Sequence, residues 1–283
     1  MSELRRRMLE DMQLHGYARA TQAAYVHAVE ALAQYHGQSP DRLTEEQVRQ
    51  FFLHLINRKR VSEGTLKTYR GGIQFFYTAT LQRAMPLFDL VARKRRRRLP
   101  VVLSFEEVQH LLGLVREPVP RMCLTTIYSC GLRLSEGARL KVRNIDSKRM
   151  MVEVRNGKGG KDRLVPLPTR TLELLRDYWK QQHPRPRPWL FPDRRKPGEP
   201  LDRHYPYKVL KAALRVSGIP KNVNVHTLRH SYATHLLEAG VDLRVIQEIL
   251  GHKSPKTTAI YTHLTQKLFE GLKKTLDGLM DSL

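Results

Sequence analysis

A block of like charges between two prolines constrains this chain more than any other feature. Residues 93–98 read Arg-Lys-Arg-Arg-Arg-Arg, and Pro86 and Pro100 lie on either side of them. The surrounding stretch has no clear amphipathic period, and neighbouring like charges repel, so such a segment stays extended until an anion neutralises it. With 283 residues, the chain is long enough to form two separate cores. We therefore expect a basic linker at 83–103 that joins two domains.

The N-terminal part of the chain, residues 1–82, has helical periodicity throughout. The helical segments expected here are 4–14, 21–35, 44–57 and 62–81. The third segment follows Thr44 and has Gln47 three residues later, the pattern of a capping box, in which each side chain bonds the other residue's backbone N–H. This part is predicted to be a small all-helical domain.

The second domain, residues 104–263, mixes helical and strand patterns. Short β runs at 151–155 and 163–167 are joined by Asn-Gly-Lys-Gly-Gly-Lys at 156–161, which indicates a β-hairpin. Helices are expected to open near 104 and 134, to span about 120–129, 171–182, 205–217, 226–239 and 243–250, and to resume after 254. The predicted fold class is mainly α with a small β-sheet, a helical domain followed by an α+β domain.

The net charge of the chain narrows its partners. Fifty Lys and Arg residues against 27 Asp and Glu residues give a formal charge of +23, as expected of a protein that neutralises phosphates. DNA or RNA is the favoured partner, although charge alone also fits ribosomal proteins and proteins of anionic membrane surfaces. The linker run is either a solvated tether or a segment that follows a phosphate backbone, and we favour the second interpretation. The expected DNA contacts are Arg93, Lys94, Arg95, Arg96, Arg97, Arg98 and Lys161.

Several other classes of protein do not fit the sequence. No apolar run approaches the roughly 18 residues of a membrane span, so we expect a soluble, cytoplasmic protein with no membrane partner. Neither a Walker loop, nor a His-Glu-x-x-His pair, nor an acidic triad is found, so no metal and no cofactor is predicted. Cys123 and Cys130 are seven residues apart on one face of an apolar helix, and we interpret both as core residues.

Six residues of the second half carry side chains suited to phosphoryl transfer. They are Arg133, Lys158, His226, Arg229, His252 and Tyr261. Guanidiniums grip phosphate oxygens with several donors, a tyrosine hydroxyl can attack phosphorus, and lysine and histidine can move protons on bridging oxygens. Such chemistry needs neither a metal nor ATP.

Each of these residues also has an ordinary interpretation when taken alone. Arg133 fits a surface arginine at a helix junction, Lys158 a basic turn, and Tyr261 a packing residue with a bonded hydroxyl. His226 and His230 are spaced to bind zinc from one helix, but no third ligand lies nearby in the sequence. His226 and Arg229 are three residues apart and so share a helix face, which makes them the most constrained pair.

The order and spacing of five motifs make the chain resemble the tyrosine recombinases of the phage-integrase and Xer group. The motifs are Gly-Leu-Arg-Leu-Ser-Glu at 131–136, Gly-Lys-Gly-Gly-Lys-Asp-Arg at 157–163, His-Thr-Leu-Arg-His at 226–230, Leu-Gly-His at 250–252 and Tyr-Thr-His at 261–263. The resemblance covers nearly the whole chain. It implies a two-domain architecture, with a helical core-binding domain before a catalytic domain.

The resemblance also implies roles for the six residues. Arg133 and Arg229 would bind the scissile phosphate and stabilise its transition state. Tyr261 would be the nucleophile that forms a 3′-phosphotyrosyl link. Lys158 would protonate the leaving 5′ hydroxyl, His226 would assist proton transfer at the tyrosine, and His252 would donate a hydrogen bond to the phosphate.

The resemblance further implies a homotetramer that acts on two double-stranded DNA sites through a Holliday junction. Residues 264–283 carry leucines every three or four positions, so a C-terminal helix is expected there that either folds back on its own domain or docks in a neighbouring subunit. The expected role is integration and excision of mobile elements or resolution of dimers, and a need for a partner recombinase or accessory protein is left open. The alternatives are a type IB topoisomerase and a non-catalytic DNA-binding protein on the same fold.

Overall fold

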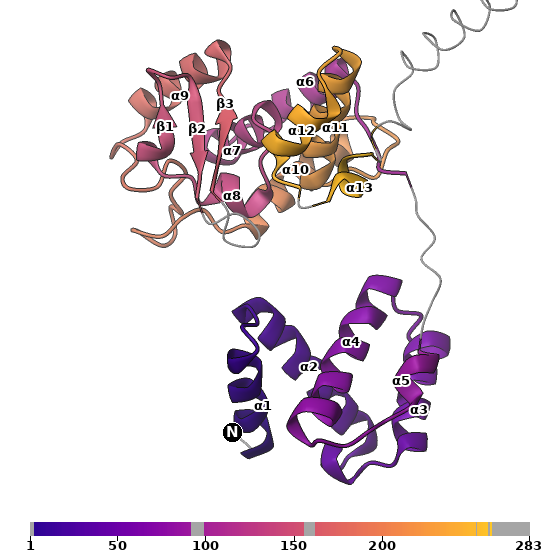
Figure 1. Cartoon of the computed structure of the whole chain (residues 1–283). Helices are drawn as coiled ribbons and strands as arrows, with labels where there is room; N and C mark the ends of the chain where they lie inside the picture. The colour runs from indigo at the N-terminus through magenta and orange to yellow at the C-terminus, as the bar shows by residue number, and fades with distance from the viewer. Residues whose placement is uncertain (1–2, 92–98, 156–161, 253, 260, 262–283) are drawn as a thin grey trace, which may run out of the picture. The chain divides into compact units, whose positions relative to one another are not determined.

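The computed structural model describes residues 3–91, 99–155, 162–252, 254–259 and 261. Several predictions fall outside the described residues, namely those for the basic run 93–98, for Lys158 and Lys161, and for the segment 264–283. The chain divides into two compact units, Met1–Arg97 and Arg98–Leu283 (Figure 1). Each unit is described by itself.

The first unit is helical, as the periodicity predicts. Its α-helices are α1 (Glu3–Leu14), α2 (Arg19–His36), α3 (Glu45–Leu53), α4 (Glu63–Phe75) and α5 (Leu87–Leu90). A 3-10 turn (Pro40–Arg42) precedes α3, and π-helical turns extend α3 (His54–Arg58) and α4 (Phe76–Thr80). The predicted capping box is present, because Gln47 N–H donates to Oγ1 of Thr44 and Thr44 N–H donates to Oε1 of Gln47. The core contains aromatic and aliphatic side chains from these helices, including Phe51, Phe52, Leu32 and Ile73.

The closest packing in this unit is between α2 and α4, at Gly71 and Gly72. A Cβ atom on Gly72 would lie 2.8 Å from the Cα atom and 2.9 Å from the carbonyl oxygen of Tyr25, so the two helix backbones meet where α4 has no side chain. A Cβ atom on Gly71 would meet the hydroxyl of the same tyrosine at 2.6 Å. Glycine inside a helix normally weakens it, and here it is retained because the interface has no room for a side chain.

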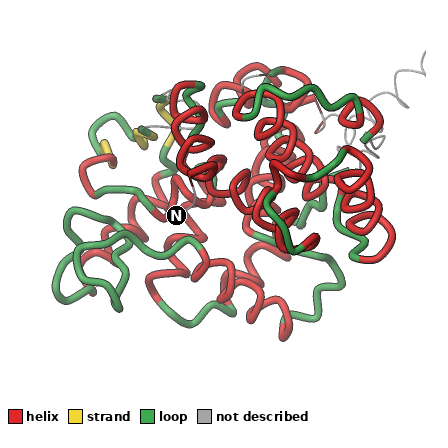
Figure 2. Tube along the Cα trace, turned by 90° about the horizontal axis from the view of Figure 1, so that it is seen from below, coloured by secondary structure: helices red, strands yellow, loops and turns green. Residues whose placement is uncertain are grey.

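The second unit contains a small antiparallel sheet and a larger set of helices. Its strands are β1 (Ile145–Asp146), β2 (Met151–Val154) and β3 (Arg163–Pro166), paired in that order with Val152 opposite Val165. Its helices are α6 (Phe105–Gly113), α7 (Pro118–Ser129), α8 (Leu134–Ala138), α9 (Thr169–Gln181), α10 (His204–Val216), α11 (Val225–Glu238), α12 (Leu243–Leu250) and α13 (Pro255–Thr258). Figure 2 shows how small a part of the trace the strands occupy. The predicted mainly helical fold with a small sheet is confirmed.

The core of the second unit lies around α7. Its residues Cys123, Leu124 and Ile127 are fully buried, and α9, α10 and α11 pack around the helix. Cys130, just past the end of α7, is also buried, and both thiols are free. Figure 1 shows the sheet on one side of this unit and α10 to α13 on the other, with α7 and α8 between them. None of the helices in the described part of the chain is long and apolar enough to cross a membrane.

We predict that Gly72→Ala destabilises the first unit. The new methyl group would overlap the backbone of Tyr25, so α2 and α4 must separate, at a cost of about 1–3 kcal/mol that exceeds the roughly 1 kcal/mol gained in helix propensity. Hydrogen exchange of amides in α2 and α4 of the full chain measures the loss. Gly64→Ala, in the first turn of α4 with its nearest neighbour atom 3.9 Å away, is the control and is expected to be neutral or stabilising. If the α2 and α4 amides exchanged hydrogen equally slowly in the two variants, the close packing of these helices at Gly72 would not matter for stability.

Candidate active site

Arg133 lies at the junction between two helices, as the sequence predicts. It is the N-cap residue of α8 and follows the turn at Gly131, whose φ of +57° favours glycine. Its Nη1 donates to Oε1 of Glu136 (2.7 Å), and its own backbone N–H donates to the other carboxylate oxygen (2.8 Å). Its Nη2 donates to the carbonyl oxygen of Gly251 (2.9 Å). The side chain, 18% exposed, is thus held by two hydrogen bonds, and the backbone of the same residue by a third.

Arg229 is the most deeply buried cation of the site, at 3% exposure. It comes from the second turn of α11, a helix capped by Asn224, whose side chain accepts from the backbone N–H of Thr227. Its Nη1 donates to the carbonyl oxygen of Gly131 (2.7 Å), and its Nη2 donates to that of Leu250. The guanidinium therefore joins the α7–α8 turn to the end of α12.

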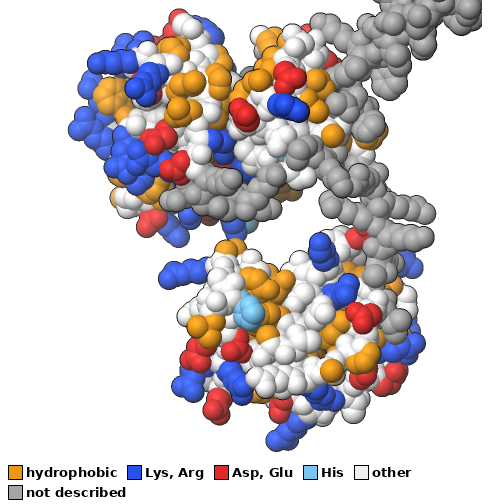
Figure 3. Space-filling model, in the orientation of Figure 1, with side chains coloured by type: hydrophobic (Ala, Val, Ile, Leu, Met, Phe, Trp, Pro, Cys, Tyr) orange, Lys and Arg blue, Asp and Glu red, His pale blue; other side chains and the backbone are white. Residues whose placement is uncertain are grey.

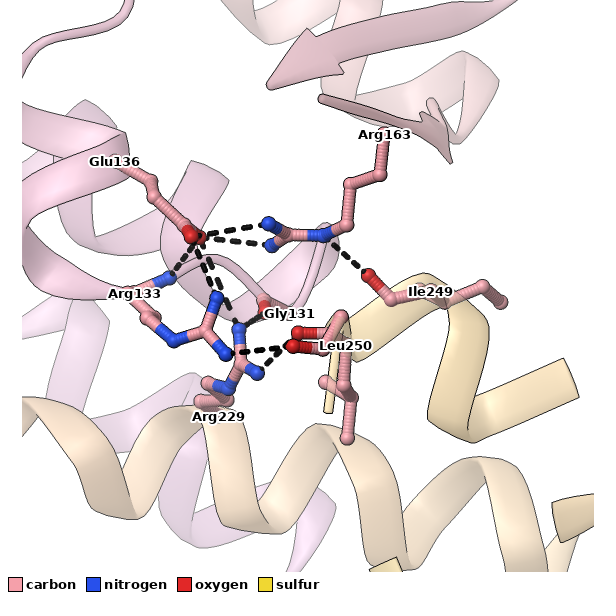
Figure 4. A network of polar contacts seen from close by, with 8 residues as sticks. Gly131, Arg133, Glu136, Arg163, Arg229, Ile249 and Leu250 are labelled. Carbon is pink, nitrogen blue, oxygen red and sulfur yellow. Dashed lines mark hydrogen bonds and ion pairs between the residues drawn. The ribbon is translucent and has the colours of Figure 1, made fainter. Parts of the chain in front are cut away.

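Arg163, at the start of β3, completes the cluster and was not among the predicted site residues. Its Nη1 and Nη2 form a bidentate pair with Glu136 (3.0 and 2.8 Å), and its Nε donates to the carbonyl oxygen of Ile249 (2.7 Å). The sequence signal that could identify Arg163 is its position as the last residue of the glycine-rich motif at 157–163, directly after Asp162. Figure 4 shows the guanidiniums of Arg133, Arg163 and Arg229 converging on one carboxylate.

The last carbonyl groups of α12 act as a second anchor for the same arginines. Ile249, Leu250 and Gly251 are consecutive, and each accepts from a different guanidinium. These carbonyl groups have no partner within the helix and carry the negative end of its dipole, so they suit cations. Gly251, with a φ of +61°, ends the helix as the sequence predicts and turns the chain toward His252.

Glu136 is the counter-charge of the cluster. It is 7% exposed, and burial alone would raise its pKa, but hydrogen bonds and charge from Arg163 and Arg133 lower the pKa to about 2. One carboxylate faces three guanidiniums, because Arg229 also lies 3.8 Å from it. The cluster keeps an excess of positive charge in a partly buried place, which favours binding of an anion.

Tyr261 lies beside this cluster, in a different local structure from the one expected. The α-helix α13 ends at Thr258, and Tyr261 has 3-10 geometry just after it instead of lying two turns into a longer helix. The side chain is 1% exposed, and its hydroxyl lies 2.9 Å from Nδ1 of His230. Burial raises the pKa of Tyr261 to about 12, although the charges of Arg229 and Arg133 lower it in part.

The surroundings of the histidines near Tyr261 lower their pKa values. Burial, together with the charges of neighbouring arginines, lowers the pKa of His252 to about 4, and burial and the charges of His226 and Arg229 do the same for His230. Desolvation and the same arginine charges also lower the pKa of His226, which is exposed on the first turn of α11. Nδ1 of His252 lies 2.8 Å from the hydroxyl of buried Thr258, which leaves Nε2 for another partner.

The structure brings five of the six predicted residues into one region, and Lys158 lies outside the described residues. Arg133, Arg229, His226, His252 and Tyr261 are linked by direct contact or by the charge interactions given above. Glu136, Arg163 and His230 belong to the same region. Among the described residues, no group of three or more His, Cys, Asp or Glu side chains is arranged to hold a metal ion, so the His226/His230 pair gains no third ligand there.

We predict that Glu136→Gln destabilises the second unit by about 3–5 kcal/mol at neutral pH, because it leaves buried guanidiniums without their counter-charge. The folded pKa of about 2 lies below the ordinary value of 4.5, so the contribution of Glu136 is present above pH 4.5 and is lost as the pH falls toward 2. This pKa difference corresponds to about 3 kcal/mol. The stability gap between wild type and variant should narrow by that amount between pH 6 and pH 2, as measured by urea unfolding. Glu173→Gln, which breaks an exposed pair with Arg170, is the control and should change stability by less than about 1 kcal/mol at any pH.

Comparison with known proteins identifies the family. The model of the phage integrase family matches residues 102–267, and that of the phage integrase N-terminal SAM-like domain matches residues 4–87. A putative integrase/recombinase, y4qK, of Sinorhizobium fredii is 43% identical over 265 residues, covering 93% of this chain and 85% of that protein. A tyrosine recombinase of Thermosipho africanus is 32% identical and covers 90% of this chain and 92% of its own length.

Solved structures agree with the sequence relatives. The crystal structure of XerA recombinase is 27% identical, with a TM-score of 0.56, and the match covers 96% of this chain and 97% of that one. XerH site-specific recombinase bound to its difH substrate after cleavage is 25% identical, with a TM-score of 0.65, over 84% of this chain and 74% of that one. The expected two-domain recombinase architecture is confirmed. The chain therefore belongs to the phage integrase family of tyrosine recombinases.

Proposed function

We propose that this site-specific recombinase cuts DNA by attack of Tyr261 on a phosphodiester held by Arg133 and Arg229. The observation that carries the proposal is the surplus of buried guanidinium charge beside a buried tyrosine hydroxyl. A surplus of fixed donors in a place of low dielectric stabilises the negative charge of a phosphoryl-transfer transition state more than water does. Membership of the family supports the same reaction.

The two arginines suit this role because part of each guanidinium is already committed to the protein. Among the described residues, two donors of Arg229 go to the carbonyl oxygens of Gly131 and Leu250, so the plane of the group is fixed while further N–H groups are left for phosphate oxygens. Arg133 is anchored in the same way by Glu136 and Gly251. Such preorganisation means that little rotamer entropy is lost when the phosphate binds.

The proton transfers use the remaining predicted residues. The hydroxyl proton leaves Tyr261 as its oxygen bonds to phosphorus, with His226 assisting, and the bond from phosphorus to the 5′ oxygen breaks. Lys158 gives that oxygen its proton, and His252 donates through Nε2 to a phosphate oxygen, since its Nδ1 is occupied by Thr258. The products are a 3′-phosphotyrosyl link and a free 5′ hydroxyl. Attack by a 5′ hydroxyl of another duplex then exchanges strands and returns the tyrosine.

We propose that the DNA backbone contacts the basic linker and the second unit. The predicted contacts are Arg93, Lys94, Arg95, Arg96, Arg97, Arg98 and Lys161. Figure 3 shows Lys and Arg side chains gathered on the part of the second unit that carries β1 and α9. Arg143, Lys148 and Arg149 line an open hollow beside β1 and add to this basic surface. Phosphate contacts of this kind position DNA without reading its sequence.

Tyr261→Phe is expected to abolish covalent attachment to DNA. DNA that stays bound to the wild-type protein after denaturation of a cell lysate should yield one recurrent site on sequencing, and the variant should yield none. Tyr232→Phe, which alters a partly buried tyrosine of the same helix as Arg229, is the control and should keep the adduct. An adduct formed by Tyr261→Phe would show that another residue is the nucleophile, and no adduct with wild type would reject the proposed reaction.

We further propose that the active form is a tetramer on two DNA sites, working in the cytoplasm on integration and excision of a mobile element. The name of the Sinorhizobium fredii relative, an integrase/recombinase, supports that role.

Deletion of residues 264–283 should prevent tetramer formation on the recovered DNA site while leaving single-site binding, as measured by mass photometry. Tetramers formed by the truncated chain would contradict this assembly. A mixture of two differently labelled duplexes distinguishes the alternatives. A recombinase joins strands of the two duplexes to each other, a topoisomerase reseals the same strand, and a protein that only binds DNA leaves both duplexes unchanged.

A further inference from the structure

We propose that His230 is the group that accepts the hydroxyl proton of Tyr261, and that it is therefore a further catalytic residue of this recombinase. The inference rests on the proposed function of Tyr261 as nucleophile. Its basis is the 2.9 Å contact between Nδ1 of His230 and the tyrosine hydroxyl, the only hydrogen bond of that hydroxyl among the described residues. The two rings are 5.7 Å apart and tilted by 53°, so the contact joins the polar edge of the imidazole to the hydroxyl.

The burial of Tyr261 makes a protein acceptor necessary. At 1% exposure, its hydroxyl has little access to water that could take the proton as the oxygen attacks phosphorus. His230 is partly buried on α11, one turn beyond His226 and next to Arg229. The acceptor is therefore carried by the same helix as the phosphate-binding arginine, which fixes the positions of base and phosphate relative to each other.

The other bases near Tyr261 are occupied or placed elsewhere. Glu136 is bonded to arginines and stays ionised down to low pH. The ring of His252 lies nearly parallel to that of Tyr261, at 6.4 Å and 19°, and its Nδ1 is bonded to Thr258. His226 is exposed and forms no hydrogen bond to Tyr261 among the described residues, and its ring lies 6.4 Å from that of His230.

Electrostatics explains how a weak base can serve a weakly acidic hydroxyl. Burial and the charges of His226 and Arg229 lower the pKa of His230 to about 4, and burial raises the pKa of Tyr261 to about 12. A bound phosphodiester brings a negative charge beside Arg229, which offsets the positive charge that disfavours imidazolium. The neutral imidazole, whose Nδ1 lies against the tyrosine hydroxyl, is the form of His230 that can accept the proton.

The step balances in both directions. The proton moves from Tyr261 to Nδ1 of His230 as the tyrosine oxygen bonds to phosphorus and the 5′ oxygen leaves with a proton from Lys158. In the second half of the reaction, a 5′ hydroxyl gives its proton to Lys158, which lost one in the first half, and attacks phosphorus, and the imidazolium of His230 returns a proton to the departing tyrosine. This role requires the tautomer that carries hydrogen on Nε2, so that Nδ1 accepts.

The same helix offers a matched control in His235. Its Nδ1 lies 2.9 Å from the hydroxyl of Tyr128, the same contact as in the proposed pair, but away from the arginine cluster. Asparagine at either position keeps an acceptor oxygen near the place of Nδ1 and removes the basic nitrogen. His230→Asn removes the proposed base, whereas His235→Asn leaves it in place and loses a bond from Nε2 to the carbonyl oxygen of Leu103.

The test is single-turnover cleavage of a synthetic duplex that carries the recovered DNA site, with a nick that makes cleavage irreversible. His230→Asn is expected to form the covalent adduct at least about 100-fold more slowly than wild type, with DNA binding unchanged, and His235→Asn at the wild-type rate. Replacement of Tyr261 by a fluorinated tyrosine, whose hydroxyl ionises at lower pH, should restore much of the rate of His230→Asn, because that hydroxyl needs less help from a base.

Three outcomes would overturn the assignment. A wild-type rate for His230→Asn would show that the contact is not used, and a faster rate would show that it restrains the tyrosine. If fluorinated tyrosine restored the cleavage rate of His226→Asn but not that of His230→Asn, the proton acceptor would be His226. Failure of the proposed function is distinguishable from all of these, because in that case wild type itself forms no adduct with the duplex.

Discussion

The site depends on one buried carboxylate. Glu136 binds Arg133 from its own helix and Arg163 from the start of β3, and it lies within reach of Arg229 from α11. Three elements that are far apart in the sequence are therefore held by a single negative charge. A lone buried charge of either sign would be costly, and the cluster is tolerated because each guanidinium also bonds to a backbone carbonyl oxygen. The excess positive charge that remains is the property that the proposed phosphate binding uses.

The fold was largely predictable because its signals are local. Helical periodicity, the Thr44–Gln47 capping box and the glycine-rich hairpin connection act over a few residues and need no knowledge of tertiary contacts. The two-residue strand β1 was missed, because so short a run has no period to detect. The length of the helix before Tyr261 was also misjudged, because Ser254 and Pro255 predict where that helix starts and leave its end undefined.

The site was predictable only in part, for a physical reason. The motifs identified groups able to bind or attack phosphate, but the partners of those groups come from distant segments. Glu136 was part of a quoted motif and sits three residues after Arg133, which resembles an ordinary ion pair on a helix surface. Its burial and its bond to Arg163 are tertiary facts that the local pattern does not contain. The sequence suggests for His230 only a role as a zinc ligand beside His226, because nothing near it in the sequence indicates the hydroxyl of Tyr261.

The end of α12 links the charge cluster to Tyr261. Three consecutive carbonyl groups of this helix hold the three arginines, and the chain that leaves it leads within about ten residues to Tyr261. Displacement of this one helix end would remove a backbone acceptor from each of the three cations and would also move the segment that carries Tyr261. The positions of the three cations and of Tyr261 therefore depend together on one short stretch of backbone.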